Sequence, residues 1–384
     1  MNTLDRILQG LARWRGRRVA VALSGGIDSA LAAALLARAG ATVLCIHLRI
    51  WRERVFDGPS DGCTPTEDAE HARAVAQHLD LPFEVLDVRE PFRRIVVEPF
   101  VKAYLAGRTP NPCAVCNPRI KLGLLADRAL AVGAVAVATG HYARVCENFR
   151  TGRVELAASA NPHKDQSYYL FGLSQNQLRR LITPLEGLTR AQVRAEVGRM
   201  GLPVAERPGS VDICFLSGGD YRPLVHRMAG LVGHDLSGPI VDLQGRRLGR
   251  HQGVFHFTIG QRRGIGISAE RPLYVIDIDP PSRTVVVGYE EQTLSAGLQL
   301  QRLHWVSRPP SDPSFHARVR IRYRHAGRPA IVHPARRPPV MVFEEPIRAV
   351  TPGQAAVAYD EAGRVLCGGW IDRRLPMNPH QSPP

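Results

Sequence analysis

Three cysteines have the types and spacing that sulfur chemistry requires. Cys113 and Cys116 stand three positions apart in a proline-punctuated loop ahead of a predicted helix, and Cys214 lies far along the chain. A helix start lowers the pKa of a thiol and favours the reactive thiolate, and the flanking Arg119 and Lys121 act in the same direction. The pair could also be half of a zinc site, but a structural zinc site needs four ligands and the sequence has no second pair. We therefore expect reactive cysteines rather than zinc ligands.

A phosphate-binding loop is predicted at residues 24–29, where Ser-Gly-Gly-Ile-Asp-Ser joins a short apolar run to an alanine- and leucine-rich segment. Glycines allow the backbone to approach an anion, and the N–H groups and dipole of a helix start favour phosphate. A glycine pair alone would indicate only a tight turn, and the loop has neither the Walker lysine nor the dinucleotide Gly-x-Gly-x-x-Gly spacing. The whole motif is similar to the pyrophosphatase loop of enzymes that adenylate an oxygen atom with ATP, in which Ser24, Asp28 and Ser29 would hold pyrophosphate.

The composition favours a polyanionic partner and a reducing compartment. Lys and Arg total 50 against 35 Asp and Glu, a formal net charge of +15 in 384 residues, and this excess favours nucleic acid. An arginine-rich composition can also reflect a GC-rich genome, so charge alone leaves both explanations open. Seven cysteines, an odd number, argue against a structural disulfide framework. The chain has no signal-peptide core and no run of about 18 apolar residues. We therefore expect a cytoplasmic protein with no membrane partner.

The elements that must position these residues alternate between strands and helices. Apolar strands are predicted at 19–23, 42–48, 83–88 and 134–138, and helices at 30–39, 67–79, 91–106 and 118–132. This pattern predicts an α/β fold, a doubly wound parallel sheet over residues 18–142. Ligands of such sheets lie at the carboxyl ends of the strands. We therefore expect the loop Ser24–Ser29, Leu48 and Thr139–His141 to border one crevice.

Further domains are predicted after this sheet. Residues 164–200 have a helical pattern and extend the first domain to about residue 219. Glycine and proline then recur, and we expect a small central linker domain at 220–284. Short alternating strands over 285–376 predict a C-terminal β-barrel or sandwich. Residues 377–384 are expected to form a disordered tail.

Eight motifs occur in the order found in bacterial tRNA-specific 2-thiouridylases, and the chain is identified as a member of that family from about residue 17 to 375. The motifs are Ser24–Ser29, Asn111–Asn117, Ala138–Tyr142, Lys164–Tyr168, Asp212–Phe215, His251–Gly253, Gly260–Gly266 and Thr351–Gln354. The resemblance implies the fold of the pyrophosphatase-loop (PP-loop) ATPases. It also implies replacement of the C2 oxygen of the wobble uridine in certain tRNAs by sulfur, using ATP, Mg²⁺ and a sulfur-donor protein of the persulfide-relay type.

The resemblance also assigns roles to individual residues. Cys116 would be the nucleophile and Cys214 the persulfide carrier. The residues implied to bind the nucleotide are Ala22, Leu23, Ser24, Gly25, Gly26, Ile27, Asp28, Ser29, Leu48 and Gly140. The residues implied to bind tRNA are Asn111, Pro112, Cys113, His141, Lys164, Asp165, Gln166, Arg322, Tyr323 and Gln354, of which the first three would border the target base.

One position departs from the family pattern, because Cys113 stands where many members have aspartate. Three cysteines, Cys113, Cys116 and Cys214, could then ligate a 4Fe–4S cluster with one open iron, as in related thiolases. The persulfide or disulfide scheme and the cluster scheme both stay open at this point. Two other functions share the same loop or fold: an ATP-dependent ligase or amidotransferase acting on small molecules, and a tRNA-binding protein without catalysis. The cysteines disfavour the first, and the intact loop disfavours the second.

Overall fold

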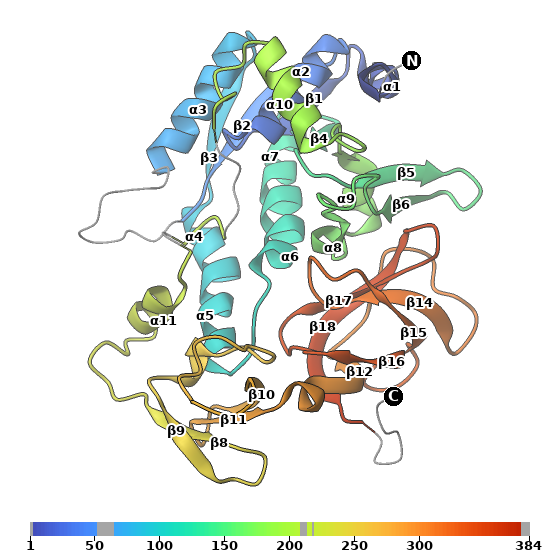
Figure 1. The fold of residues 1–384 in the computed structure, drawn as a ribbon. Helices are drawn as coiled ribbons and strands as arrows, with labels where there is room; N and C mark the ends of the chain where they lie inside the picture. The colour runs from blue at the N-terminus through green and yellow to red at the C-terminus, as the bar shows by residue number, and fades with distance from the viewer. Residues whose placement is uncertain (1–2, 52–64, 208–212, 217–218, 378–384) are drawn as a thin grey trace. The chain divides into compact units, whose positions relative to one another are not determined.

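The computed structural model describes residues 3–51, 65–207, 213–216 and 219–377. The chain forms two compact units (Figure 1). The first unit comprises Met1–Val96, Cys113–Asp220 and Gly363–Val365, and the second comprises Val97–Pro112, Tyr221–Ala362 and Leu366–Pro384. Apart from Met377, the predicted disordered tail lies outside the described residues.

The first unit is built on a parallel sheet, as predicted. Its strand order is β3-β2-β1-β4-β7, with parallel pairing throughout. The strands are β1 (Arg18–Ala22), β2 (Thr42–Arg49), β3 (Phe83–Asp87), β4 (Ala136–Ala138) and β7 (Leu181–Ile182). Because β1 pairs with β2 on one side and with β4 on the other, the loop that follows β1 lies where the strand order reverses. Ligands of doubly wound sheets bind at this position.

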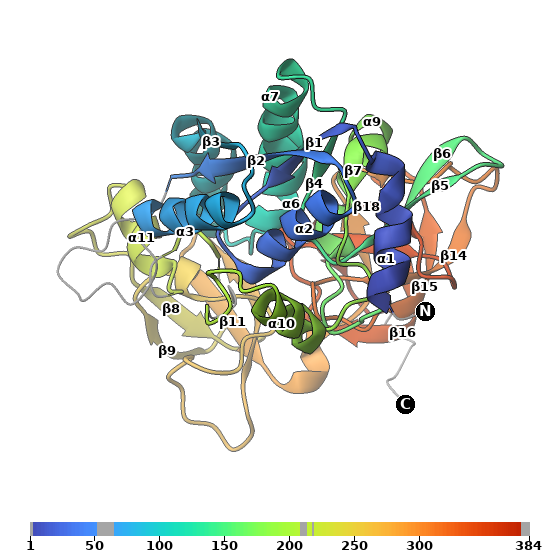
Figure 2. The same ribbon diagram turned by 90° about the horizontal axis from the view of Figure 1, so that it is seen from above.

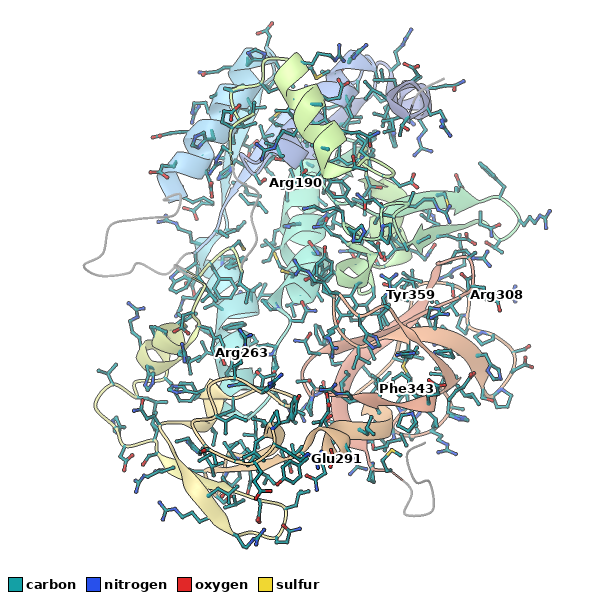
Figure 3. All side chains as sticks on the ribbon, in the orientation of Figure 1. Arg190, Arg263, Glu291, Arg308, Phe343 and Tyr359 are labelled. Atoms are coloured by element: carbon teal, nitrogen blue, oxygen red, sulfur yellow. The ribbon has the colours of Figure 1, made fainter. Side chains whose placement is uncertain are left out.

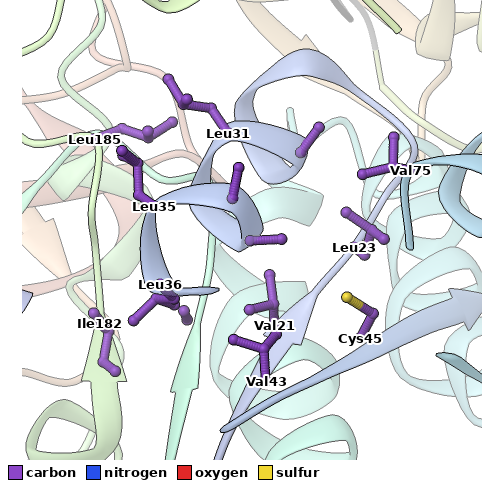
Figure 4. Packing of buried hydrophobic residues seen from close by; sticks show 14 of the residues in the cluster. Val21, Leu23, Leu31, Leu35, Leu36, Val43, Cys45, Val75, Ile182 and Leu185 are labelled. Atoms are coloured by element: carbon purple, nitrogen blue, oxygen red, sulfur yellow. The ribbon is translucent and has the colours of Figure 1, made fainter. Parts of the chain in front are cut away.

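Helices cover both faces of this sheet. In Figure 2, α2, α3 and α10 lie on one side of it and α7 on the other. Nearly all of α2 is buried, because its alanines and leucines join Val21, Val43 and Ile182 in one apolar cluster (Figure 4). The helices that cover the sheet are α1 (Thr3–Leu11), η1 (Ala12–Trp14), α2 (Ile27–Arg38), α3 (Pro65–His78), α7 (Leu125–Ala131) and α10 (Arg190–Arg199).

Two of the predicted helices contain π-helical turns. The predicted helix 91–106 consists of α4 (Arg89–Phe92), the π-helical turn η2 (Arg93–Val97) and α5 (Glu98–Leu105). The predicted helix 118–132 begins earlier, with α6 (Pro112–Cys116) and the π-helical turn η3 (Asn117–Leu124), before α7. Pro118 lacks the N–H group that an α-helix continuing from α6 would need, so the hydrogen-bonding register changes after Cys116.

The rest of the first unit follows β4 in the chain. An antiparallel hairpin is formed by β5 (Arg144–Asn148) and β6 (Arg153–Ala157). The predicted helical region 164–200 contains α8 (Ser167–Leu170), α9 (Gln175–Arg180) and α10. Between α9 and α10, β7 pairs with β4, so this region also contributes a strand to the sheet.

The second unit contains a small sheet and a barrel. The small sheet has the order β10-β11-β8-β9 and a core that includes Ile240, Val275 and Val285. Its elements are α11 (Arg222–Met228), β8 (Gly238–Val241), β9 (Arg247–His251), η4 (Val254–His256), β10 (Tyr274–Asp279) and β11 (Thr284–Gly288).

The C-terminal strands form a closed β-barrel, which is one of the two architectures, barrel or sandwich, predicted from the sequence. Strands pair in the order β12-β16-β15-β14-β17-β18, and β12 also pairs with β18. Phe343, labelled in Figure 3, belongs to the barrel core. The elements are η5 (Glu290–Thr293), β12 (Leu294–Leu300), β13 (His304–Trp305), β14 (Phe315–Arg320), β15 (Arg328–His333), β16 (Val340–Arg348), β17 (Ala355–Tyr359) and β18 (Val365–Leu375). Over the described ranges, none of the helices has the length and apolar character to span a membrane.

Candidate active site

The phosphate loop joins β1 to α2 and is fixed by its own hydroxyl groups. Ser29 Oγ donates to the carbonyl of Gly26 at 3.0 Å and accepts the N–H of Ser24 at 3.1 Å. The hydroxyls of Ser24 and Ser29 lie 3.0 Å apart. Ser29 is buried, whereas Ser24 is exposed. The residues predicted to bind the nucleotide between Ala22 and Ser29 therefore comprise the end of β1, the connecting loop and the first residues of α2.

Asp28 is held by two residues from other elements. The hydroxyl of Tyr142 donates to Asp28 Oδ1 at 2.6 Å, and Arg190 Nη1 lies 3.5 Å from Asp28 Oδ2. Arg190, labelled in Figure 3, is the first residue of α10 and is only partly buried. Burial raises the pKa of Tyr142, and the neighbouring Asp28 raises it further, so the phenol stays protonated as a donor. Arg190 adds a positive charge at the loop that the sequence analysis missed.

A second arginine contacts the phosphate loop. Arg207 Nη1 donates to the carbonyl of Gly25 at 2.7 Å, and Arg207 Nη2 donates to Asp68 Oδ1 at 3.0 Å. Asp68 belongs to α3, so this arrangement links three segments of the first unit. Arg207 is not predictable as a site residue, because nothing local to its position in the sequence indicates a contact with a loop so far away in the chain.

The segment Gly140–Tyr142 lies against the phosphate loop, as predicted from the strand ends. A Cβ atom on Gly140 would lie 2.9 Å from both Asp28 C and Ser29 N, closer than real Cβ atoms approach other atoms. Only glycine therefore allows this segment to pack on the first turn of α2. Leu48, near the carboxyl end of β2, is half-buried, and the neighbouring His47 Nδ1 lies 2.9 Å from the carbonyl of Leu23.

The cysteine pair is buried, which overturns the expectation of lowered thiol pKa values. Cys116 is buried at the end of α6, Cys113 is half-buried, and Cys214 is exposed. Burial raises the pKa of Cys113 to about 11 and that of Cys116 to about 12. The positive charge of Lys121 lowers both pKa values, but this effect is smaller than that of desolvation. A five-residue helix within the protein interior cannot offset the lost hydration of a thiolate.

His141 connects the cysteine region with the phosphate loop. It is buried, and its Nδ1 lies 2.9 Å from Thr139 Oγ1. Burial lowers the pKa of His141 well below its usual value, and Lys121 lowers it further. His141 is therefore neutral. The positive charge of Lys121 thus lowers the pKa values of both His141 and Cys116.

The described residues give no support for an iron–sulfur cluster at the three thiols. Cys113, Cys116 and Cys214 are close enough to influence one another's ionisation. Among the described residues, however, no group of three His, Cys, Asp or Glu side chains converges closely enough to hold a metal ion. Cys116 and Cys214, which both lie in described parts of the chain, are not joined by a disulfide. The cluster hypothesis therefore has no support from the donor arrangement.

Two of the predicted tRNA-binding residues in the first unit make internal contacts. Asp165 is buried, and its Oδ1 accepts the N–H groups of Ser159 and Ser167 at 3.0 and 3.1 Å. Gln166 Oε1 accepts the N–H of Tyr142 at 3.1 Å, while Lys164 is only half-buried. Asp165 and Gln166 thus shape the backbone beside the phosphate loop.

The second unit holds the remaining predicted tRNA-binding residues. Gln354 Nε2 donates to the carbonyls of Thr109 and Pro110 at 3.0 and 3.2 Å, directly before the buried Asn111 and Pro112. On the barrel, after β14, Arg322 is exposed and Tyr323 half-buried. Gln354 is thus brought together with the segment that leads into Asn111. Arg322 follows β14, whose register with β17 runs toward the end of β17 that adjoins Gln354.

Three family models match consecutive parts of the chain. They are the tRNA methyl transferase HUP domain at residues 17–218, the tRNA methyl transferase PRC-barrel domain at 229–289 and the Aminomethyltransferase beta-barrel domain at 295–371. The first of these models covers the parallel sheet, the phosphate loop and the three cysteines discussed above.

Curated relatives match over nearly the whole length of the chain. The tRNA-specific 2-thiouridylase MnmA of Solibacter usitatus is 42% identical over 367 residues, which cover 92% of this chain and 99% of that protein. The protein of the same name from Syntrophotalea carbinolica is 44% identical over 358 residues, covering 93% and 99%. The structure of NMN synthetase from Francisella tularensis is 15% identical and covers 60% of this chain and 87% of that chain. Its TM-score of 0.36 is too low to support an argument.

Proposed function

The chain belongs to the tRNA-specific 2-thiouridylase family, and from that premise we propose that it replaces the C2 oxygen of the wobble uridine of certain tRNAs by sulfur. Family membership makes the chain a tRNA-modifying sulfurtransferase. One observation carries the finer proposal. Tyr142 donates to Asp28 in the phosphate loop and to the side chain of Gln166, and the α8 segment that follows Gln166 accepts a hydrogen bond from Asn117, the residue after Cys116. The phosphate loop and the cysteine region therefore share one set of supporting contacts.

The first step is adenylation of the uridine, because a carbonyl oxygen is a poor leaving group. The uridine O2 attacks the α-phosphorus of ATP, an O–P bond forms, and the bond to the β-phosphate breaks to release pyrophosphate. The N–H groups at the start of α2, together with Arg190 and Arg207, support binding of this pyrophosphate. Asp28 is the carboxylate that would hold Mg²⁺, which offsets phosphate charge when it is bound.

The second step transfers sulfur. The terminal sulfur of a persulfide on Cys214 attacks C2, and AMP leaves. The Cys116 thiolate then attacks the inner sulfur of Cys214, which breaks the bond to the transferred sulfur, releases 2-thiouridine and forms a Cys116–Cys214 disulfide. A dithiol reduces this disulfide by two electrons, and a sulfur-donor protein reloads Cys214. The exposure of Cys214 and the burial of Cys116 support this division of roles.

We further propose that the functions are divided along the chain and that the enzyme works in the cytoplasm. Residues 1–219 would carry the ATP and sulfur chemistry, residues 220–284 would link the domains, and the barrel at 285–376 would bind tRNA. The exposed Arg322 on the barrel and the net charge of +15 support a contact with the RNA backbone.

The test is to replace each cysteine separately. Cys116→Ser and Cys214→Ser should each abolish ATP-dependent 2-thiolation of tRNA while tRNA affinity stays at the wild-type level, because phosphate contacts lie elsewhere. Cys146→Ser, on the exposed hairpin strand β5, is the matched control and should remain active. Wild-type thiolation by either active-site variant would contradict the proposal, as would a loss of tRNA affinity that accounts for the loss of activity.

A further inference from the structure

The π-helical turn η3 begins directly after Cys116 and carries Lys121. In an α-helix, side chains three or four positions apart lie on the same face. In a π-helix the backbone hydrogen bonds join residues five positions apart, so the turn is wider and different side chains come together. Lys121 follows Cys116 by five positions and is close enough to lower the pKa of its thiol. The helical register after Cys116 therefore determines whether the ammonium group lies near this cysteine. Single π-helical turns are uncommon and often lie at functional sites.

The side chain of Gln177, in the first turn of α9, holds η3 in place. Gln177 Nε2 donates two hydrogen bonds of 2.7 Å, to the carbonyls of Pro118 and Leu122. Its Oε1 accepts the N–H of Ser174 at 2.9 Å and the Ser174 hydroxyl at 3.2 Å. One carboxamide thus uses both donors and its acceptor at once, and it joins the start of α9 to two carbonyls within η3.

Two further contacts support this arrangement. A Cβ atom on Gly123 would lie 3.0 Å from the carbonyl oxygen of Pro118, so glycine leaves room for the orientation in which that carbonyl accepts from Gln177. Asn117 Nδ2 donates to the carbonyl of Tyr169 at 3.2 Å. The turn is therefore tethered to the α8–α9 segment at its first residue and again within its length.

Comparison with a second helix of the same unit shows which contacts of Gln177 belong to the helix cap and which do not. Helix α10 begins with the same capping box, in which Thr189 N–H donates to Gln192 Oε1 at 2.8 Å. Gln192 is exposed, and its Nε2 makes no hydrogen bond to any described residue. Glutamate serves as well as glutamine in a capping box. The cap alone thus does not require an amide at position 177, whereas the two bonds to η3 do.

We propose that Gln177 is a positioning residue for sulfur transfer, which fixes the helical register after Cys116 through the carbonyls of Pro118 and Leu122. The inference rests on the proposed role of Cys116 as the nucleophile. Gln177 touches neither substrate nor the reacting sulfur atoms. Its function is to hold Cys116 and Lys121 in one geometry.

The test compares Gln177→Glu with the matched control Gln192→Glu. Both substitutions keep the capping acceptor, but only the first puts a carboxylate oxygen in place of the donor that faces two carbonyls. Gln177→Glu should lower kcat for thiolation by about 10- to 100-fold, the scale expected for a displacement of roughly 1 Å. The KM for tRNA and the rate of ATP-dependent pyrophosphate release should not change. Gln192→Glu should match the wild type in all three measurements.

Two additional variants keep the outcome decisive. If Gln177→Glu does not fold, Gly123→Ala displaces the Pro118 carbonyl from the other side and should give the same selective loss of kcat. Wild-type kcat in a folded Gln177→Glu protein would overturn the inference, and so would an equal loss of pyrophosphate release. Cys116→Ser, assayed in parallel, distinguishes failure of the Gln177 inference from failure of the proposed function. If Cys116→Ser still thiolates tRNA, the proposed role of Cys116 itself fails.

Discussion

At the residue scale, burial rather than the helix start determines the state of the cysteine pair. Loss of hydration raises the pKa values of Cys113 and Cys116, and the opposing charge of Lys121 does not cancel this effect. At neutral pH both thiols are therefore protonated in this arrangement. A protonated, buried thiol is protected from oxidants and is a poor nucleophile. In the proposed mechanism, activation of Cys116 then depends on a change in its surroundings, such as the arrival of tRNA.

Alkylation of Cys116 tests this protonation state. Because the raised pKa favours the protonated thiol, its thiolate fraction should rise about tenfold per pH unit from pH 7 to 10 without reaching a plateau. A small free thiol, with a pKa of about 8.5, should level off within this range and serves as the control. The measurement is the rate of iodoacetamide labelling at Cys116, followed by mass spectrometry. A plateau below pH 9 would show that the thiol pKa is not raised.

Arg190 is expected to contribute to ATP binding. It lies 3.5 Å from Asp28 in the phosphate loop, where pyrophosphate would bring further negative charge. Arg190→Gln removes one charge-assisted contact and should raise the KM for ATP by about tenfold. Arg199→Gln is the control, because Arg199 lies on the same helix and pairs with Glu196 at the surface. An unchanged KM for ATP in Arg190→Gln would exclude this role.

At the element scale, the close approach of Gly140 to α2 predicts that adding one methyl group at this position displaces the phosphate loop. Gly140→Ala would place a Cβ atom 2.9 Å from Asp28 C and Ser29 N, and the phosphate loop would have to move. Pyrophosphate release should fall by about 10- to 100-fold while the protein remains folded. The control is Gly198→Ala in α10, where a Cβ atom has nothing within 4 Å. Full ATP use by Gly140→Ala would mean that the loop tolerates displacement.

The main strands and the parallel sheet were accessible from the sequence because the apolar runs are continuous, whereas the strand order is known only from the structure. Residues 42–48 and 83–88 were predicted as strands and correspond to β2 and β3. The π-helical turns were not predicted, because an apolar periodicity does not distinguish a π turn from an α turn over a few residues. Strand β7 was not predicted either. It has two residues, Leu181 and Ile182, and only its pairing with β4 defines it.

The candidate site was predicted where its residues form a local motif, as Ser24–Ser29 do, or lie at the carboxyl ends of predicted strands, as Gly140 does. The loop Ser24–Ser29 could be recognised from its own sequence. Arg190 and Arg207 could not, because their contacts with the loop depend on tertiary packing. Asp165 illustrates the opposite case: a charged residue in a prominent motif is buried and bonds to neighbouring N–H groups. The sequence shows that such a residue is special but does not distinguish a structural contact from a tRNA contact.

At the scale of the whole molecule, the net charge of +15 is the property most relevant to a polyanionic substrate. Neutralising phosphates releases counterions, so binding to nucleic acid weakens as salt concentration rises. Any basic surface gives this dependence, whatever the origin of its charge. The effect of one arginine on the slope therefore separates a specific phosphate contact from a composition that is merely basic.

The last prediction concerns the salt dependence of tRNA binding. The affinity should fall linearly on a plot of log K against log salt, and Arg322→Ala should reduce the magnitude of that slope by about 1, the value for one lost phosphate contact. Arg322 is exposed after β14, so its removal should not disturb the barrel core. Arg199→Ala, on a helix of the first unit and paired with Glu196, should leave the slope unchanged. Equal slopes for the wild type and Arg322→Ala would place the phosphate contacts elsewhere, and a slope near zero would remove the electrostatic argument for tRNA binding.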